Sequence, residues 1–140
     1  MTHWLGVASA EHVRRGVSLS IAQIGHGKRG GLASMRAGDS IVYYSPRESL
    51  ADAKPTLRAF TAIGHLPDDT VWQADEGDFR PWRRKVAYVH DAVEVALISL
   101  GGALELTVDP QWGYQLRRGL IELSAHDHAL IHGAMTGVRR

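Results

Sequence analysis

Apolar positions in the first third of the chain follow a strand period and then a helix period. Residues 3–9 alternate in polarity, which predicts a strand, and the apolar residues of segment 10–17 recur at helical spacing. Residues 32–35 predict a one-turn helix. Residues 40–45 are apolar on both faces of an extended chain, so we expect a strand that is covered on both sides.

Short strands dominate the rest of the pattern. They are predicted at residues 58–66, 71–74, 82–89 and 120–123. Residues 93–100 fit a strand and a helix equally well.

The chain ends in a predicted amphipathic helix. Ser124 and Asp127 resemble a capping box with Asp in place of Glu, and the apolar stripe that follows them predicts burial of Leu130, Ile131, Ala134 and Met135. Short strands with peripheral helices do not alternate regularly, as a parallel sheet requires. We therefore expect an antiparallel, barrel-like α+β fold.

Length and composition narrow the class of protein. The 140 residues fit one domain, 1–140, and the absence of cysteine excludes disulfides, a thiol nucleophile and thiolate metal sites. No stretch resembles a signal peptide or a membrane span, so we expect a cytoplasmic protein without a membrane partner. A net charge of +1 excludes a strongly basic coat but leaves room for local basic patches.

The densest chemistry lies between residues 24 and 46. The glycine-rich loop 25–31 lets backbone N–H groups approach an anion, and Lys28 and Arg29 in it favour phosphate. The following strand sends Tyr43 and Tyr44 to opposite faces, so one can pack while the other faces a ligand. This run predicts a small-ligand or nucleobase pocket.

Two later segments, 79–85 and 112–118, each set aromatic rings beside paired arginines. Aromatic faces stack on exposed bases and guanidinium groups hold phosphates. Either segment by itself is more typical of a core tryptophan beside a solvated charge run. When both segments and the glycine loop are taken together, nucleic-acid binding and a purely structural role are about equally supported.

Other motifs are weaker. A nucleotide-triphosphatase phosphate loop is rejected, because Ala22 stands where its first glycine belongs and Arg29 replaces the required hydroxyl. His26 suits a pocket wall better than a general base, since no carboxylate partner is fixed. Neither His128 with His132 nor the acidic turn 75–78 is expected to hold a metal, and no cofactor is predicted.

Five motifs, in this order and at compatible spacing, resemble the small stand-alone branch of the EVE domain family. They are WLGVAS (4–9), HGK (26–28), MRAGD (35–39), YYSP (43–46) and WGY (112–114). The resemblance covers nearly the whole chain. It implies a PUA-like fold, a twisted and mostly antiparallel β pseudo-barrel with short peripheral helices, related to the YTH and PUA domains.

The resemblance also implies a function without catalytic residues, in which a modified base, notably modified cytosine, enters an aromatic-lined pocket. Carried onto this chain, the base pocket draws on Ser9, His26, Gly27, Lys28, Tyr43, Tyr44, Ser45, Trp82 and Trp112. Phosphate contacts fall to Arg29, Arg83, Arg84 and Arg117.

The chain lacks the Ser-Glu-Pro and Asn-Tyr-Gln patterns of the better-studied EVE branch. Its ligand therefore need not be the ligand of that branch. The favoured hypothesis is a noncatalytic reader of modified cytosine or methyladenine in DNA or RNA. The alternatives are a module for structured or unmodified RNA and, less favoured, a nucleotide or small-molecule enzyme. Neither the pathway nor the oligomeric state follows from the sequence.

Overall fold

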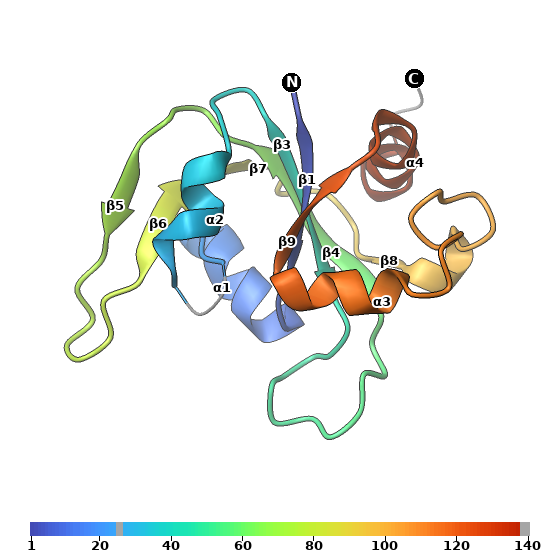
Figure 1. The fold of residues 1–140 in the computed structure, drawn as a ribbon, viewed down its shortest axis with the longest axis horizontal. Helices are drawn as coiled ribbons and strands as arrows, with labels where there is room; N and C mark the ends of the chain where they lie inside the picture. The colour runs from blue at the N-terminus through green and yellow to red at the C-terminus, as the bar shows by residue number, and fades with distance from the viewer. Residues whose placement is uncertain (25–26, 138–140) are drawn as a thin grey trace.

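The computed structural model describes residues 1–24 and 27–137 and shows a mixed α+β fold (Figure 1). The strands are β1 (His3–Val7), β2 (Ile21–Ala22), β3 (Ser40–Ser45), β4 (Ala59–His65), β5 (Val71–Gln73), β6 (Trp82–Lys85), β7 (Ala87–Tyr88), β8 (Val95–Ala96) and β9 (Leu120–Leu123). The helices are α1 (Ala10–Leu19), α2 (Arg29–Ser34), α3 (Trp112–Gln115) and α4 (Ala125–Thr136), with 3-10 turns η1 (Leu97–Ser99) and η2 (Leu116–Arg118).

The main sheet has the order β7-β4-β3-β1-β9, with β8 also paired to β4, and a smaller sheet has the order β2-β6-β5. β1 pairs with β3 in parallel and the other pairings of the main sheet are antiparallel, so the sheet is mixed and, as expected, mostly antiparallel. The pairings within the described parts of the chain leave the main sheet open. They do not confirm a closed pseudo-barrel.

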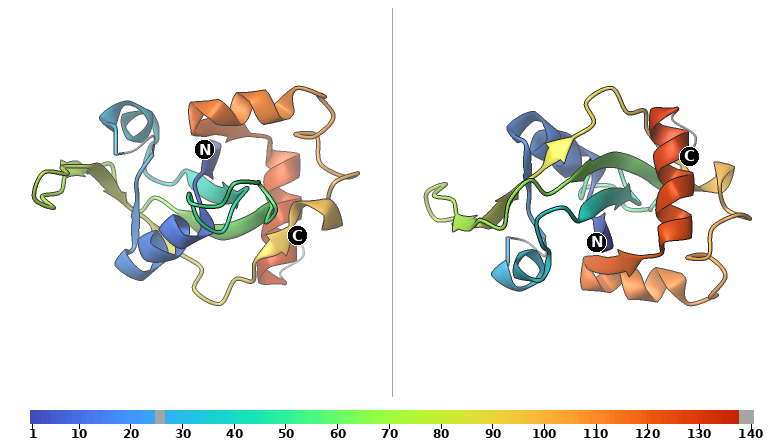
Figure 2. Two further views of the ribbon diagram at one scale, coloured as in Figure 1. Left: turned by 90° about the horizontal axis from the view of Figure 1, so that it is seen from below. Right: turned by 90° about the horizontal axis from the view of Figure 1, so that it is seen from above.

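Strand β3 separates two hydrophobic clusters. Its six residues are all buried, as predicted, and Ile41 and Tyr43 enter one cluster while Val42 and Tyr44 enter the other. Both views in Figure 2 place α1 and α2 on one side of the central strands and α4 on the other. The helices therefore cover opposite faces of the sheet.

One predicted strand is divided in the structure. Residues 82–89 form β6 and β7, which belong to different sheets, with the buried Val86 between them. The Val86 N–H donates to the carbonyl of Ser20 (2.9 Å), one residue beyond the Ile21–Lys85 pair of the β2–β6 ladder, and β7 then pairs with β4. Alternating polarity predicted the extended backbone correctly but carried no information about the change of partner.

The ends of the long helices obey local capping rules. Ser9 and Ser124 have extended backbones and accept hydrogen bonds from His12 N and Asp127 N, respectively. The Asp127 carboxylate does not complete the capping box; it accepts from Glu105 N and Leu106 N, both at 2.8 Å. In α4, Ile131 and Met135 are buried as predicted, whereas Leu130 and Ala134 are only half-buried.

The short α2 begins within the predicted glycine loop, so Arg29 lies in a helix and not in the loop. Segment 93–100, which was ambiguous, contains β8 and then η1. No helix in the described ranges is both long and apolar enough to serve as a membrane span.

Candidate functional site

Four segments meet at the end of β1 and enclose a pocket of about 340 Å³, here called the Ser9 pocket. They are the turn from β1 into α1, positions 23 and 27, the start of loop 46–58, and residues 116–119. Hydrogen bonds join these walls: Val7 N donates to the Gly119 carbonyl and Ala10 N to the Arg47 carbonyl, both at 2.9 Å. Backbone hydrogen bonds thus tie the walls of the pocket to one another.

Ser9 and Gly27 lie in this pocket for identifiable local reasons. Ser9 caps α1, so it must stand where β1 ends and the helix begins. Gly27 has φ +83°, and a Cβ there would come within 2.5 Å of the Pro81 Cβ. The Gly27 carbonyl accepts from Trp82 N (2.8 Å), which ties this position to β6. A glycine is therefore required at position 27.

The other loop residues lie around this position. His26 falls outside the described residues. Lys28 is exposed at the start of α2 and makes no side-chain capping bond. The Arg29 guanidinium lies over the Trp82 ring at 5.6 Å, and Trp82 itself is half-buried against the cluster that contains Tyr43.

A second cavity, of about 200 Å³, lies between α1 and the β5–β6 hairpin. Tyr43 is part of its wall, so we call it the Tyr43 cavity; it shares His12 and Gln23 with the Ser9 pocket. The Tyr43 hydroxyl donates to the Gln23 carbonyl (3.2 Å). Burial raises the pKa of Tyr43, so its hydroxyl stays protonated at neutral pH.

Tyr44 and Trp112 lie in the second cluster, on the opposite face of the sheet from Tyr43, and Ser45 is buried as the last residue of β3. Tyr44 packs edge-on against Trp112 with ring centroids 5.9 Å apart, and the Ser45 hydroxyl bonds to Thr61 Oγ1 (2.7 Å). None of the three lines the Ser9 pocket or the Tyr43 cavity. The contacts that the structure gives these side chains are packing and hydrogen-bonding contacts within the fold.

Replacing Trp112 by alanine is expected to lower the free energy of unfolding by about 2–3 kcal/mol, because the ring packs on Tyr44 in the second cluster. Urea denaturation measures the change. Tyr114→Ala in the same helix is the control, since Tyr114 is 68% exposed, and about 0.5 kcal/mol or less is expected there. Equal losses in the two variants would show that Trp112 is not a packing residue.

The four arginines of the expected phosphate set differ in environment. Arg117 is exposed at the Ser9 pocket, 4.9 Å from the Tyr114 ring, whereas Arg83 lines the Tyr43 cavity. Arg84 is completely buried and donates to backbone carbonyls, so it has no route to a phosphate. Neither Arg117 nor its neighbour Arg118 forms an ion pair within residues 1–24 and 27–137.

Comparison with known proteins gives the family. The model of the EVE domain matches residues 2–134. This chain belongs to the EVE domain family. A UPF0310 protein of Renibacterium salmoninarum is 50% identical over 133 residues, covering 95% of this chain and 94% of that protein. The UPF0310 protein YdcG of Bacillus subtilis is 35% identical over 135 residues, covering 95% and 91%.

Solved structures agree on the fold of this EVE domain. Rpa0253 from Rhodopseudomonas palustris superposes with a TM-score of 0.61 at 15% identity, over 100% of this chain and 97% of that one. PSPTO5229 from Pseudomonas syringae gives 0.56 at 13% identity, over 94% and 97%. EVE domains are a PUA-like family often tied to nucleic-acid binding.

Several lining residues of the Ser9 pocket were not in the predicted site, among them His12, Arg118, Arg47 and Gln23. Arg47 begins the loop after β3 and lines the Ser9 pocket, and its Nε is buried without a hydrogen-bond partner in the described structure. Gln23 lines both cavities. Neither Arg47 nor Gln23 belongs to a motif that the sequence pattern singled out.

Among the residues that the structure describes, one group of acidic and histidine side chains brings its potential ligand atoms together. Glu105, His126 and Asp127 place ligand atoms within 4.8 Å of one another, but the Asp127 carboxylate already accepts two backbone N–H groups. His128 stacks on His3 with ring centroids 4.1 Å apart. In the acidic turn, Glu76 pairs with two arginines.

Proposed function

We propose that this EVE domain is a noncatalytic nucleic-acid-binding module that holds a modified nucleobase in the Ser9 pocket. The observation that carries the proposal is the pocket itself. Its 340 Å³ lie at the lower end of the range of about 300–1,000 Å³ typical of small-ligand sites. Arg47, Arg117 and Arg118 line it together with Ser9 and Gly27.

The pocket differs from the aromatic cage that the family resemblance implied. Among its described lining residues, His12 supplies an imidazole, but there is no Trp, Tyr or Phe. Guanidinium planes and imidazole rings also stack on unpaired bases. We therefore assign stacking to Arg117 and His12, and the support of the sheet to Trp112.

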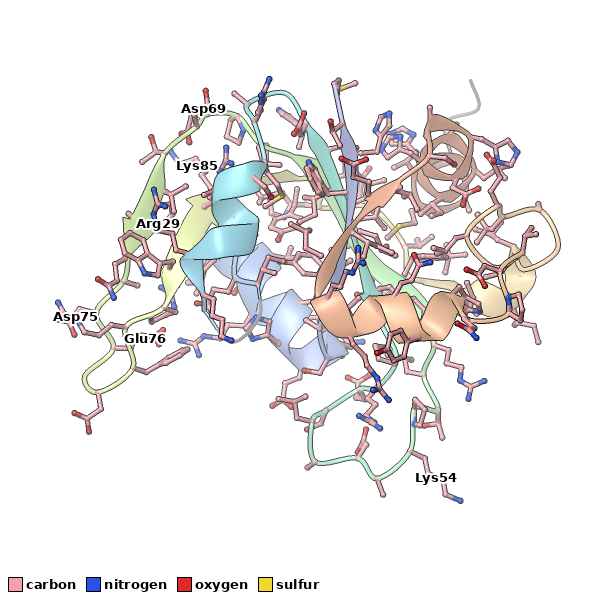
Figure 3. All side chains as sticks on the ribbon, viewed as in Figure 1. Arg29, Lys54, Asp69, Asp75, Glu76 and Lys85 are labelled. Atoms are coloured by element: carbon pink, nitrogen blue, oxygen red, sulfur yellow. The ribbon has the colours of Figure 1, made fainter. Side chains whose placement is uncertain are left out.

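Charge around the opening favours the phosphate backbone. Arg117 and Arg118 lie on one wall, and the exposed Lys28 and Arg29 follow Gly27 on another. Figure 3 shows Lys54 on loop 46–58 pointing outward and Arg29 lying between α2 and the β5–β6 strands, where its guanidinium covers the Trp82 ring. Extruding a base from a duplex costs a few kcal/mol, so these contacts must add to whatever the pocket supplies.

The test is fluorescence anisotropy with short labelled strands. The strands carry cytosine, 5-methylcytosine, 5-hydroxymethylcytosine or N6-methyladenine, as DNA and as RNA, at two salt concentrations. Preference for one modification supports the base reader. Equal, salt-sensitive binding of all strands, or of RNA alone, favours the general RNA module, and no binding at either salt rejects nucleic acid as the ligand.

The double change Arg117→Gln with Arg118→Gln is expected to weaken binding of every strand. The slope of log K against log salt should become shallower by about 0.7 for each phosphate of a single strand that the variant no longer neutralises. Arg36→Gln is the matched control, because Arg36 is exposed near the start of β3, at the other end of the sheet. An equal effect of the control would exclude this wall as the phosphate site.

A further inference from the structure

The Gln23 side chain is held in one orientation. Arg83 Nε donates to Gln23 Oε1 at 2.6 Å, and the Gln23 backbone carbonyl accepts from the Tyr43 hydroxyl. A guanidinium can only donate, so the amide oxygen must face Arg83. The amide nitrogen, Nε2, is then the group left for a ligand, and no hydrogen bond to it is formed by the residues that the structure describes.

Arg83 is itself fixed by an ionic chain. Its Nη2 bonds to the Glu76 carboxylate, and Glu76 also accepts from Arg15 Nη2 at 3.1 Å. The hydrogen bond from Arg83 lowers the pKa of Glu76, with a smaller contribution from the charge of Arg15, so the chain stays ionised at neutral pH. Figure 3 shows Glu76 on the hairpin that faces α1.

The Ser9 pocket offers a second unused donor. Arg47 Nε is buried and has no acceptor in the described parts of the chain, although a buried N–H normally has one. Gln23 and Arg47 both line this pocket. An acceptor supplied by a ligand would satisfy the buried guanidinium nitrogen, which an N–H of a ligand would not.

We propose that Arg83 is a positioning residue that locks Gln23, so that Gln23 Nε2 and Arg47 Nε present only N–H donors to the ligand. The pocket then selects a base with an acceptor at this wall, either a carbonyl oxygen or an unprotonated ring nitrogen. This inference rests on the proposed function and adds the rule by which bases are distinguished.

The experiment compares two base pairs of matched shape in otherwise identical single strands: 5-methylcytosine with thymine, and adenine with hypoxanthine. Within each pair an amino donor becomes a carbonyl acceptor and an unprotonated ring nitrogen gains a proton. For at least one pair, the native protein should bind one member about tenfold more tightly, the effect of one well-placed hydrogen bond.

Three variants separate positioning from packing. Arg83→Leu frees the Gln23 amide to turn. The ratio of the affinities for the two members of a pair should therefore fall below about threefold. Gln23→Glu keeps the shape and the bond to Arg83 but replaces the donor by an oxygen, so the ratio should shift about tenfold toward the other member. Arg15→Leu, which removes the other partner of Glu76, should leave the ratio unchanged.

An unchanged ratio in Arg83→Leu, or an equal loss in Arg15→Leu, would overturn the assignment even if strands still bind. Should Arg83→Leu fail to fold, Gln23→Glu decides the question, since it retains the ionic chain. If the native protein binds both members of each base pair with equal affinity, the inference is rejected, but the proposal of nucleic-acid binding stands. If no strand binds, both fall.

Discussion

Replacing Arg84 by methionine is expected to remove about 3 kcal/mol or more of folding free energy. Arg84 is fully buried, and its guanidinium donates to the carbonyls of Leu32 (2.9 Å), Met35 and Asp68 (2.6 Å). Methionine fills similar space but leaves these carbonyls without a donor. Since a domain is stable by only about 5–15 kcal/mol, this loss is large.

Urea denaturation measures the effect of Arg84→Met, and Lys85→Met is the matched control. Lys85 is the next residue, is exposed and lies in the same strand, so its change should be about 0.5 kcal/mol or less. A loss below about 1 kcal/mol for Arg84→Met would mean that water or a shifted backbone satisfies the carbonyls. Because Arg84 joins α2 to the small sheet, its removal should also disturb the Gly27 wall of the pocket.

Asp39→Asn is expected to destabilise the fold by about 2 kcal/mol at pH 7. The Asp39 carboxylate is buried and accepts from Thr2 N (3.0 Å), Trp4 Nε1 (2.9 Å) and Arg36 N (2.9 Å). Asparagine keeps the shape but exchanges one acceptor oxygen for a donor, which then faces another donor.

The same carboxylate makes stability depend on acid. Burial by itself raises the pKa of Asp39, but the three donors, Trp4 first, outweigh burial and hold it below the usual value. A lowered pKa in the folded state contributes stability above the unfolded pKa of about 3.9, and this contribution is lost as the pH falls through the folded pKa. Unfolding measured at pH 7, 5 and 3 should show this loss in the native protein and a weaker one in Asp39→Asn.

Asp78→Asn provides the comparison for Asp39, since Asp78 is exposed on the acidic turn. The free energy of unfolding of Asp78→Asn should change with pH as that of the native protein does. If the free energy of unfolding of Asp39→Asn also changes with pH as in the native protein, the Asp39 carboxylate is not the cause of the loss of stability in acid.

Periodicity predicted elements well where a local rule decides them. Ser9 and Ser124 begin helices as their capping chemistry requires, and the alternating Tyr43 and Tyr44 reach opposite clusters. The parallel pairing of β1 with β3 was missed, because strand direction depends on how the intervening helix crosses the sheet and not on polarity.

The candidate site could be predicted only in part. The family motifs indicated Ser9, Gly27 and Arg117, which the structure brings together. Arg83 and Arg84 look alike in sequence, yet one fixes a glutamine and the other is buried among carbonyls. That difference arises from the alternation of β6 between its two faces and from partners distant in sequence, which no local pattern contains.

The position of β1 between β3 and β9 has a consequence for synthesis of the chain on the ribosome. One edge of β1 is paired once β3 is made, but the other waits for β9 at residues 120–123. At about 5–20 residues per second, that hydrogen-bonding edge stays open for on the order of 10 s in each nascent chain. A denatured full-length chain has both partners from the start, so refolding in solution bypasses the interval in which this edge is exposed to neighbouring chains.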